Sequence, residues 1–294
     1  MEITQTKPLH VRLSILVPML AFCVFGVNDA VIARAAAASL LPDVPESAAV
    51  AIESKTFAST CYSNTSPGNS INTHGGFAVS SNIWNPGSAA SRQCTSASVQ
   101  SSGVVTSAEF DWDFTSTNSD VKTYPNLQFG QQNSYRPSTT HLLPAPISAL
   151  PSLTATGTIT TTCVKGPCLY DTAFDLFVSK SPKSAPQIEG ELMIMTDYNL
   201  PGLGGFTWSS PVTIDGATYN IRQFQMKSEG RSWPYVAYFA TSPITQIKLN
   251  INHFVADAVK RGYLPGSYYV DMVSIGTEVQ TGQGITKITN YKIQ

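Results

Sequence analysis

The chain has 294 residues, of which 42% are hydrophobic and only 13% are charged, and its formal net charge is −1 at pH 7. A near-neutral chain with scattered Lys and Arg excludes a nucleic-acid surface, which needs clustered basic residues. The small charged fraction and the many Ser, Thr, Asn and Gln residues are typical of an exported all-β protein.

The N-terminal 38 residues have the pattern of a signal peptide. Lys7 and Arg12 precede an apolar run over 13–27, and the alanine-rich stretch 33–38 offers several cleavage sites. That run is shorter than the roughly 20 apolar residues of a membrane span, although an uncleaved anchor remains the alternative. We therefore expect a secreted protein without a membrane partner. Residues 39–56 then form a linker or pro-region, and 57–294 form one domain, because no Pro/Ser-rich linker or repeat divides them.

The cysteines predict two disulfide bonds. Cys23 lies in the signal segment, and the four that remain are Cys61, Cys94, Cys163 and Cys168. An even number of cysteines in an exported chain favours disulfides. A Gly-Pro turn separates Cys163 from Cys168, so 163–168 with 61–94 is the simplest of three connectivities. The rival, a metal site, is disfavoured because the histidines of the mature chain lie at no ligand spacing from these cysteines.

From residue 58 onward, short segments of alternating polarity are separated by turn signals. The predicted strands span 76–84, 103–114, 155–163, 172–179, 190–196, 211–214, 218–226, 234–241, 245–251, 267–279 and 285–291. Residues 252–262 instead show apolar residues at helical spacing, with Asn252 as a candidate N-cap and Gly262 as a stop. Many short strands with one helix predict a sandwich or barrel.

Two of the predicted strands each carry one glutamate among apolar residues. Side chains alternate between the faces of a strand, so Glu191, Met193 and Met195 point away from the intervening Leu and Ile. By the same rule Glu278 points away from its Val and Ile neighbours. If the Leu, Ile and Val side chains form the core, both glutamates project from the opposite face, and two facing carboxylates can cleave a glycosidic bond. Alternation alone does not select this pair, because either glutamate could be solvated and other acids are available.

Three further residues could share that face. Asp175 alternates with apolar residues in 174–178, and Asn82 and Trp84 alternate away from the apolar positions of 79–83. An exposed Trp suits the apolar face of a sugar ring, whereas an ordinary packed aromatic is the alternative for Trp84. Trp112 shares a face with two phenylalanines and is expected in the core.

Six short segments match a known set of motifs in the same order. They are 81–85 (Ser-Asn-Ile-Trp-Asn), 121–126 (Val-Lys-Thr-Tyr-Pro-Asn), 174–177 (Phe-Asp-Leu-Phe), 191–195 (Glu-Leu-Met-Ile-Met), the helix segment 257–263, and 276–278 (Gly-Thr-Glu). Together they resemble glycoside hydrolase family 12, the small secreted endoglucanases and xyloglucanases. The resemblance runs from about residue 62 to residue 293.

The resemblance implies an all-β fold, a jelly-roll β-sandwich of two curved antiparallel sheets with one short helix. It implies that Glu191 is the nucleophile and Glu278 the general acid/base of a retaining glycosidase. Glu191 must then be ionised, while Glu278 must hold a proton. Asp175 would hydrogen-bond the nucleophile, and Asn82 and Trp84 would line the substrate cleft.

The implied activity is endo-hydrolysis of β-1,4-glucosidic bonds in cellulose, mixed-linkage β-glucan and xyloglucan, by a monomer that needs no cofactor or metal. The family also has a disulfide resembling 61–94, and its bacterial members have a small loop resembling 163–168. Met195 stands where many members have Trp, so we expect Met193 and Met195 to contact substrate and leave the preferred glucan open. A xyloglucan-specific endoglucanase and a non-catalytic glucan-binding jelly roll are the alternatives.

Overall fold

A computed structural model describes residues 52–63, 71–86, 91–115, 120–131, 137–182, 188–228 and 230–294. The predicted signal peptide 1–38 and most of the predicted linker lie outside these residues. Strand β1 begins at Ser54, three positions before the predicted start of the domain. Within the described ranges, no helix has both the length and the apolar character to cross a membrane.

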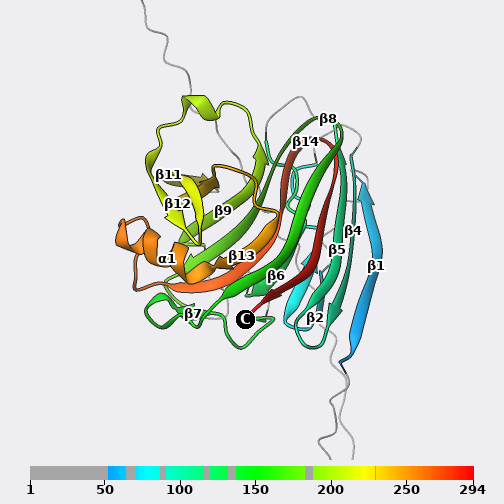
Figure 1. Cartoon of the computed structure of the whole chain (residues 1–294), viewed down its shortest axis with the longest axis horizontal. Helices are drawn as coiled ribbons and strands as arrows, with labels where there is room; N and C mark the ends of the chain where they lie inside the picture. The colour runs from blue at the N-terminus through cyan, green and yellow to red at the C-terminus, as the bar shows by residue number, and fades with distance from the viewer. Residues whose placement is uncertain are drawn as a thin grey trace, which may run out of the picture.

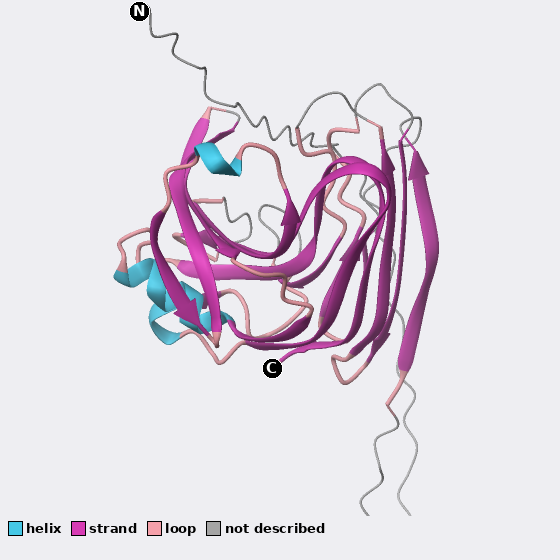
Figure 2. Cartoon of the chain, turned by 45° about the horizontal axis from the view of Figure 1, so that its top comes forward, coloured by secondary structure: helices cyan, strands magenta, loops and turns pink. Residues whose placement is uncertain are grey.

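The described residues form fourteen strands and one α-helix (Figures 1 and 2). The strands are β1 Ser54–Ser63, β2 Ile71–His74, β3 Phe77–Ser80, β4 Ser91–Gln100, β5 Val105–Phe114, β6 Asn126–Gly130, β7 Ala145–Pro146, β8 Thr154–Ser179, β9 Gly190–Asn199, β10 Ser209–Ile214, β11 Ala217–Ser228, β12 Arg231–Ala240, β13 Gln246–Asn250 and β14 Tyr269–Ile293. The helix is α1, Ile251–Lys260, and two 3-10 turns span Ile147–Ala149 and Leu203–Gly205.

Strands β8 and β14 organise the whole molecule. They pair antiparallel from Tyr269 opposite Ser179 to Ile293 opposite Ala155, with register shifts where both strands bend. The sheet order is β1-β4-β5-β14-β8-β9-β12-β11-β10. Because both long strands curve from one layer into the other, this sheet folds over into two layers (Figure 1). Neighbours are antiparallel except β9 and β12, which run parallel, and the predicted jelly-roll class is confirmed.

The main core fills the space between the two layers. Phe110 of β5 and Ile288 of β14 face Leu192 of β9 and Phe174 of β8 in one buried cluster. Tyr291 crosses the interior to Phe174, with ring centroids 6.4 Å apart. Each such apolar side chain contributes about 1.5–3 kcal/mol on burial. Trp112 is also fully buried, as the sequence predicted, in a smaller cluster.

A closed ring of four threonine hydroxyls lies inside the bend of β8 and β14. Thr161 is opposite Thr286, and Thr172 is opposite Thr277. The Oγ1 atoms are 2.6 Å apart for 161 and 172, 3.0 Å for 172 and 277, 2.7 Å for 277 and 286, and 3.0 Å for 286 and 161. Buried hydroxyls need partners, and here each finds two without leaving the ring.

Helix α1 confirms the helix prediction but corrects its start. Its N-cap is Asn250, whose side-chain oxygen accepts the backbone N–H of Asn252 at 3.1 Å. The predicted cap, Asn252, instead accepts the backbone N–H of Leu153 through its own side chain at 2.9 Å. Gly262 follows the helix in the left-handed conformation, φ 74°, which suits a glycine stop.

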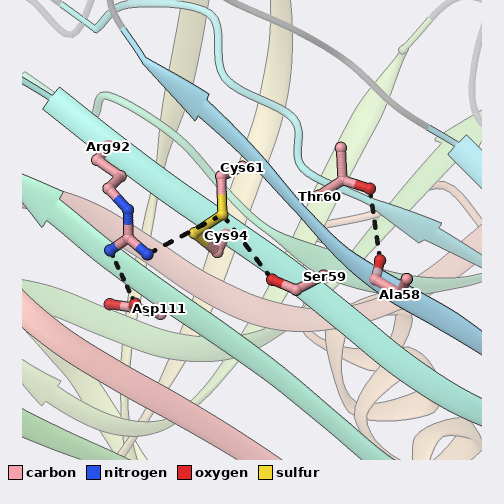
Figure 3. The surroundings of a disulfide bond; sticks show 7 residues. All are labelled: Ala58, Ser59, Thr60, Cys61, Arg92, Cys94 and Asp111. Atoms are coloured by element: carbon pink, nitrogen blue, oxygen red, sulfur yellow. Dashed lines mark hydrogen bonds and ion pairs between the residues drawn. A yellow bond between two sulfur atoms is a disulfide. The ribbon is translucent and has the colours of Figure 1, made fainter.

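Both predicted disulfides are present. Cys61 and Cys94 lie directly opposite each other on β1 and β4, and their bond fastens the edge strand (Figure 3). Cys163 and Cys168 close a small loop within β8. The 61–94 bond spans 33 positions, and a loop of that size contributes about 3–4 kcal/mol in the chain-entropy model.

Candidate active site

The candidate site lies on the face of β8, β9, β12 and β14 that points away from the main core, called the outer face below. Glu191 on β9, Asp175 on β8 and Glu278 on β14 all alternate with core residues and share this face. β8 brings them together, because it pairs with β9 along one edge and with β14 along the other. Glu191 is 9% exposed and Asp175 is 6% exposed, whereas Glu278 is half-buried.

A fourth carboxyl, Asp171, joins the three that the sequence predicted. It is the direct cross-strand neighbour of Glu278 and is 2% exposed. The two carboxyl groups share a hydrogen bond. Asp171 lies four residues before Asp175, so alternation would have placed it on the same face had the predicted strand begun one residue earlier.

The electrostatics of these four acids are dominated by burial. Burial raises the pKa of Glu191 to about 8, despite an opposing hydrogen bond from Trp233, and the charge of Glu278 adds to the rise. Burial also raises the pKa of Asp171 to about 7. The pKa values of Asp175 and Glu278 are raised well above their usual range, first by burial and then by the neighbouring carboxylates. Relative to an isolated carboxylate, each of the four pKa values is therefore shifted toward the protonated form.

Glu191 is oriented by a second residue that the sequence did not reveal. The indole Nε1–H of Trp233, a buried residue of β12, donates to Glu191 Oε2 at 2.9 Å. The next outer-face residue of β12, Tyr235, lies opposite Glu191 and donates its hydroxyl to Met193 Sδ at 2.9 Å. The predicted strand began at 234, so Trp233 was left just outside it.

Asp175 lies beside the two glutamates, as predicted. Among the neighbouring charges, that of Glu191 raises the pKa of Asp175 most, followed by those of Glu278 and Asp171. Its Oδ1 is buried and has no hydrogen-bond partner among the described residues. The electrostatic contact with Glu191 is therefore present, whereas the hydrogen bond between the two stays a prediction.

Met193 and Met195 share the outer face with Glu191, as alternation predicted, but both are buried, with exposed fractions of 2% and 4%. They belong to an apolar cluster that includes Tyr235 and Phe239, and the half-buried Trp208 packs against that cluster. Direct contact between these methionines and substrate stays a prediction, and their burial favours support of the aromatic side chains.

Asn82 and Trp84 lie on a segment that backbone hydrogen bonds connect to residues 122–124 and, through these, to β14. Tyr124 donates its backbone N–H to the Asn82 carbonyl at 3.1 Å, and Lys122 accepts from the Trp84 N–H at 3.3 Å. The same stretch joins β14 next to Glu278, because the Lys122 N–H donates to the Val279 carbonyl at 2.8 Å. Trp84 is half-buried, and its indole N–H has no partner among the described residues.

Across the described ranges, no group of three or more His, Cys, Asp or Glu residues is placed to hold a metal ion. The functional side chains described on the outer face are four carboxyl groups, the indole N–H of Trp233 and the hydroxyl of Tyr235. Such a set can donate a proton, accept one and supply a carboxylate nucleophile.

Comparison with known proteins gives one family. The model described as "Glycosyl hydrolase family 12" matches residues 75–294. Endoglucanase S of Pectobacterium parmentieri is 26% identical over 191 residues, which cover 63% of this chain and 70% of that protein.

Solved structures have the same fold. A family 12 xyloglucanase from Bacillus licheniformis in complex with ligand has a TM-score of 0.69 at 19% identity, covering 81% of this chain and 99% of its own. A metagenome-derived glycoside hydrolase family 12 endoglucanase has a TM-score of 0.65 at 23% identity, covering 82% and 97%.

Proposed function

This chain belongs to glycosyl hydrolase family 12, and from that premise we propose that it cleaves internal β-1,4-glucosidic bonds of plant glucans with retention of configuration. The observation that carries the proposal is the placement of Glu191 and Glu278 on one face, on the two strands that flank β8. A retaining glycosidase needs such a pair, with carboxyl groups about 5–5.5 Å apart.

In the proposed reaction, ionised Glu191 attacks the anomeric carbon while protonated Glu278 gives its proton to the leaving oxygen. Water, deprotonated by Glu278, then hydrolyses the glycosyl-enzyme. After the second step Glu191 is again a free carboxylate and Glu278 is again protonated, so the cycle consumes no cofactor.

The surroundings of each glutamate support its assigned role. The Trp233 N–H stabilises the charged form of Glu191, which lowers its pKa against the effect of burial. Among the described residues no indole or other N–H donates to Glu278, and burial, the Asp171 charge and the hydrogen bond with Asp171 all raise its pKa. The proton is therefore held more firmly on Glu278, the group that must donate it. Asp175 adds negative charge beside both.

A dedicated xyloglucanase is the second candidate, supported by the structural similarity to the Bacillus licheniformis xyloglucanase and by Met195 in place of a bulkier Trp. Parallel rates on carboxymethylcellulose, mixed-linkage β-glucan and xyloglucan separate the two. A rate on xyloglucan that exceeds both others many-fold would select the second candidate.

Substitution of each glutamate tests the assigned roles. We expect Glu191→Gln to lower kcat by several orders of magnitude on every substrate, because it removes the nucleophile. Glu278→Gln should be nearly as damaging on glucans but milder on aryl glycosides, whose leaving groups need little protonation. Glu109→Gln, which breaks a surface ion pair with Lys287, is the control and should leave rates unchanged.

Two outcomes would contradict the assignment. One is near-normal release of reducing sugar by either active-site variant, and the other is an equal loss for Glu278→Gln on glucans and aryl glycosides. Proton NMR of the first product must also show the β-anomer. Glucan binding without any release of reducing sugar by the wild type would instead indicate a non-catalytic binding module.

We also propose that the protein is secreted as a monomer after removal of residues 1–38, with 39–56 as a linker. Two disulfides support an oxidising destination. N-terminal sequencing of material from the culture medium tests the cleavage, and light scattering tests the oligomeric state.

A further inference from the structure

Asp171 is a buried acid for which the proposed reaction has no role. It lies directly opposite Glu278 in the β8–β14 pairing, is 2% exposed, and shares a hydrogen bond with that glutamate. Its Oδ1 has no partner among the described residues. A carboxyl that only filled space here would cost free energy, because an uncompensated buried polar atom is unfavourable.

We propose that Asp171 is a positioning residue for Glu278, and that the two carboxyl groups share protons across β8 and β14 and so set the alkaline limit of activity. The inference deepens the proposed function and rests on the assignment of Glu278 as general acid/base. It requires that neither carboxyl be neutralised by a cation.

The groups around the pair meet that requirement. The titratable residues that neighbour the pair lie on β8, β9, β12 and the stretch before β6. They are Asp175, Glu191, Tyr198, Tyr235, Tyr124 and Lys122. Lys122 is the one cation of this set, and its ammonium donates to the backbone carbonyl of Asp120. Of the charges on described residues, the one that acts most on Glu278 is the negative charge of Asp171.

Two carboxyls in contact release their protons in two separated steps, one below and one above the pKa of a single carboxyl in the same place. Asp171→Asn leaves one carboxyl with one intermediate pKa, while the amide can still hydrogen-bond Glu278. The alkaline limb of kcat/KM must then move. It moves to lower pH if one shared proton suffices for catalysis, and to higher pH if both groups have to be protonated.

The experiment measures kcat/KM against pH on soluble β-glucan for the wild type, Asp171→Asn and Asp171→Ala. We expect the alkaline limb of Asp171→Asn to move by about one pH unit or more, the scale of a like-charge interaction. Asp171→Ala should show the same shift with a larger loss of kcat, because it also removes the hydrogen bond that orients Glu278. Asp113→Asn, a half-buried acid of β5 outside the site, is the matched control and should keep the wild-type profile.

An alkaline limb of Asp171→Asn that superimposes on that of the wild type would overturn the inference. Glu278→Gln is measured in parallel to separate this outcome from failure of the proposed function. If Glu278→Gln remains active on β-glucan, Glu278 is not the general acid and the proposed function itself fails. If D171N does not fold, carboxyl-carbon NMR of the wild type decides. If the two groups share protons, the carboxyl-carbon resonances of Asp171 and Glu278 both shift at the same two pH values. Independent single-step titrations of the two resonances would overturn the proposal.

Discussion

At Glu191, burial and one hydrogen bond act in opposite directions on the ionisation of a single carboxyl. Burial favours the neutral form, and the Trp233 N–H favours the charged form that a nucleophile requires. Hydrogen bonds to charged groups are worth about 1.5–3 kcal/mol, so this one contact can move a pKa by about one to two units.

Trp233→Phe isolates that contact, because Phe keeps an aromatic ring but lacks the N–H donor. Loss of the donor raises the pKa of Glu191, so the carboxylate forms only at higher pH. We expect the acidic limb of kcat/KM to move up by about one pH unit, with little movement of the alkaline limb. A pH profile of the variant checks this, and an unchanged acidic limb would contradict it.

Met195 is the residue at which structure most changes an expectation from sequence. A side chain that is only 4% exposed, packed in the cluster with Phe239, leaves little room for a larger ring. We expect Met195→Trp to lower the free energy of unfolding by about 1–3 kcal/mol through overpacking, measured by urea denaturation, and Met195→Leu to cost less than about 1.5 kcal/mol. Unchanged stability with a lower KM on linear glucans would instead show that position 195 reaches the substrate.

Among the elements, β8 and β14 carry the threonine ring and three of the four acids, Asp171, Asp175 and Glu278. The hydroxyl of Thr277 forms hydrogen bonds with those of Thr172 and Thr286. Val has nearly the same shape as Thr but no hydroxyl, so Thr277→Val removes both hydrogen bonds. We expect Thr277→Val to cost about 1–3 kcal/mol of unfolding free energy, because two buried hydroxyls each lose a partner. Thr162→Val, at an exposed position of β8, is the control and should change stability little. Equal effects of the two substitutions would mean that the ring contributes nothing.

Alternation predicted the faces of these elements better than their ends. It placed Glu191, Asp175 and Glu278 on one face because mostly apolar residues alternate with them. Asp171 and Trp233 were missed because each lies one residue before the start of a predicted strand, where turn-forming residues weaken the pattern.

The long strands and the edge strands could not be predicted in full. The Gly-Pro stretch within 163–168 indicates a turn, and only the pairing with β14 shows that the strand continues through it. β1 and β4 are rich in Ser and Thr, so little apolar periodicity marks them. The register of Glu278 against Asp171 depends on strand pairing, which one strand's sequence does not specify.

For the molecule as a whole, the buried acids link stability to pH. Asp271 is fully buried with one oxygen bonded to Ser179 at 2.9 Å, and burial raises its pKa to about 7. Asp171 and Glu191 are raised in the same sense. Between the pKa of an unfolded carboxyl, about 4, and these higher folded values, the folded state binds more protons than the unfolded state. The free energy of unfolding therefore falls as pH rises.

We expect the protein to be more stable at pH 5 than at pH 8, with a slope of up to about 1.4 kcal/mol per pH unit for each raised carboxyl. Asp271→Asn removes one such group, so the difference in melting temperature between the two pH values should shrink. Asp113→Asn should leave that difference unchanged. A wild-type stability that rises from pH 5 to pH 8 would be inconsistent with raised carboxyl pKa values in the folded state.

The ring of four threonine hydroxyls lies immediately behind Asp171 and Glu278, since Thr172 and Thr277 are their neighbours in the chain. Each hydroxyl can donate once and accept once around the ring, in either of two opposite senses. In both senses the four O–H dipoles run head to tail and largely cancel. The ring thus cross-links the bend of the sheet with polar groups that carry little net dipole, so four buried hydroxyls are accommodated behind the two carboxyls without a large oriented dipole pointing at either of them.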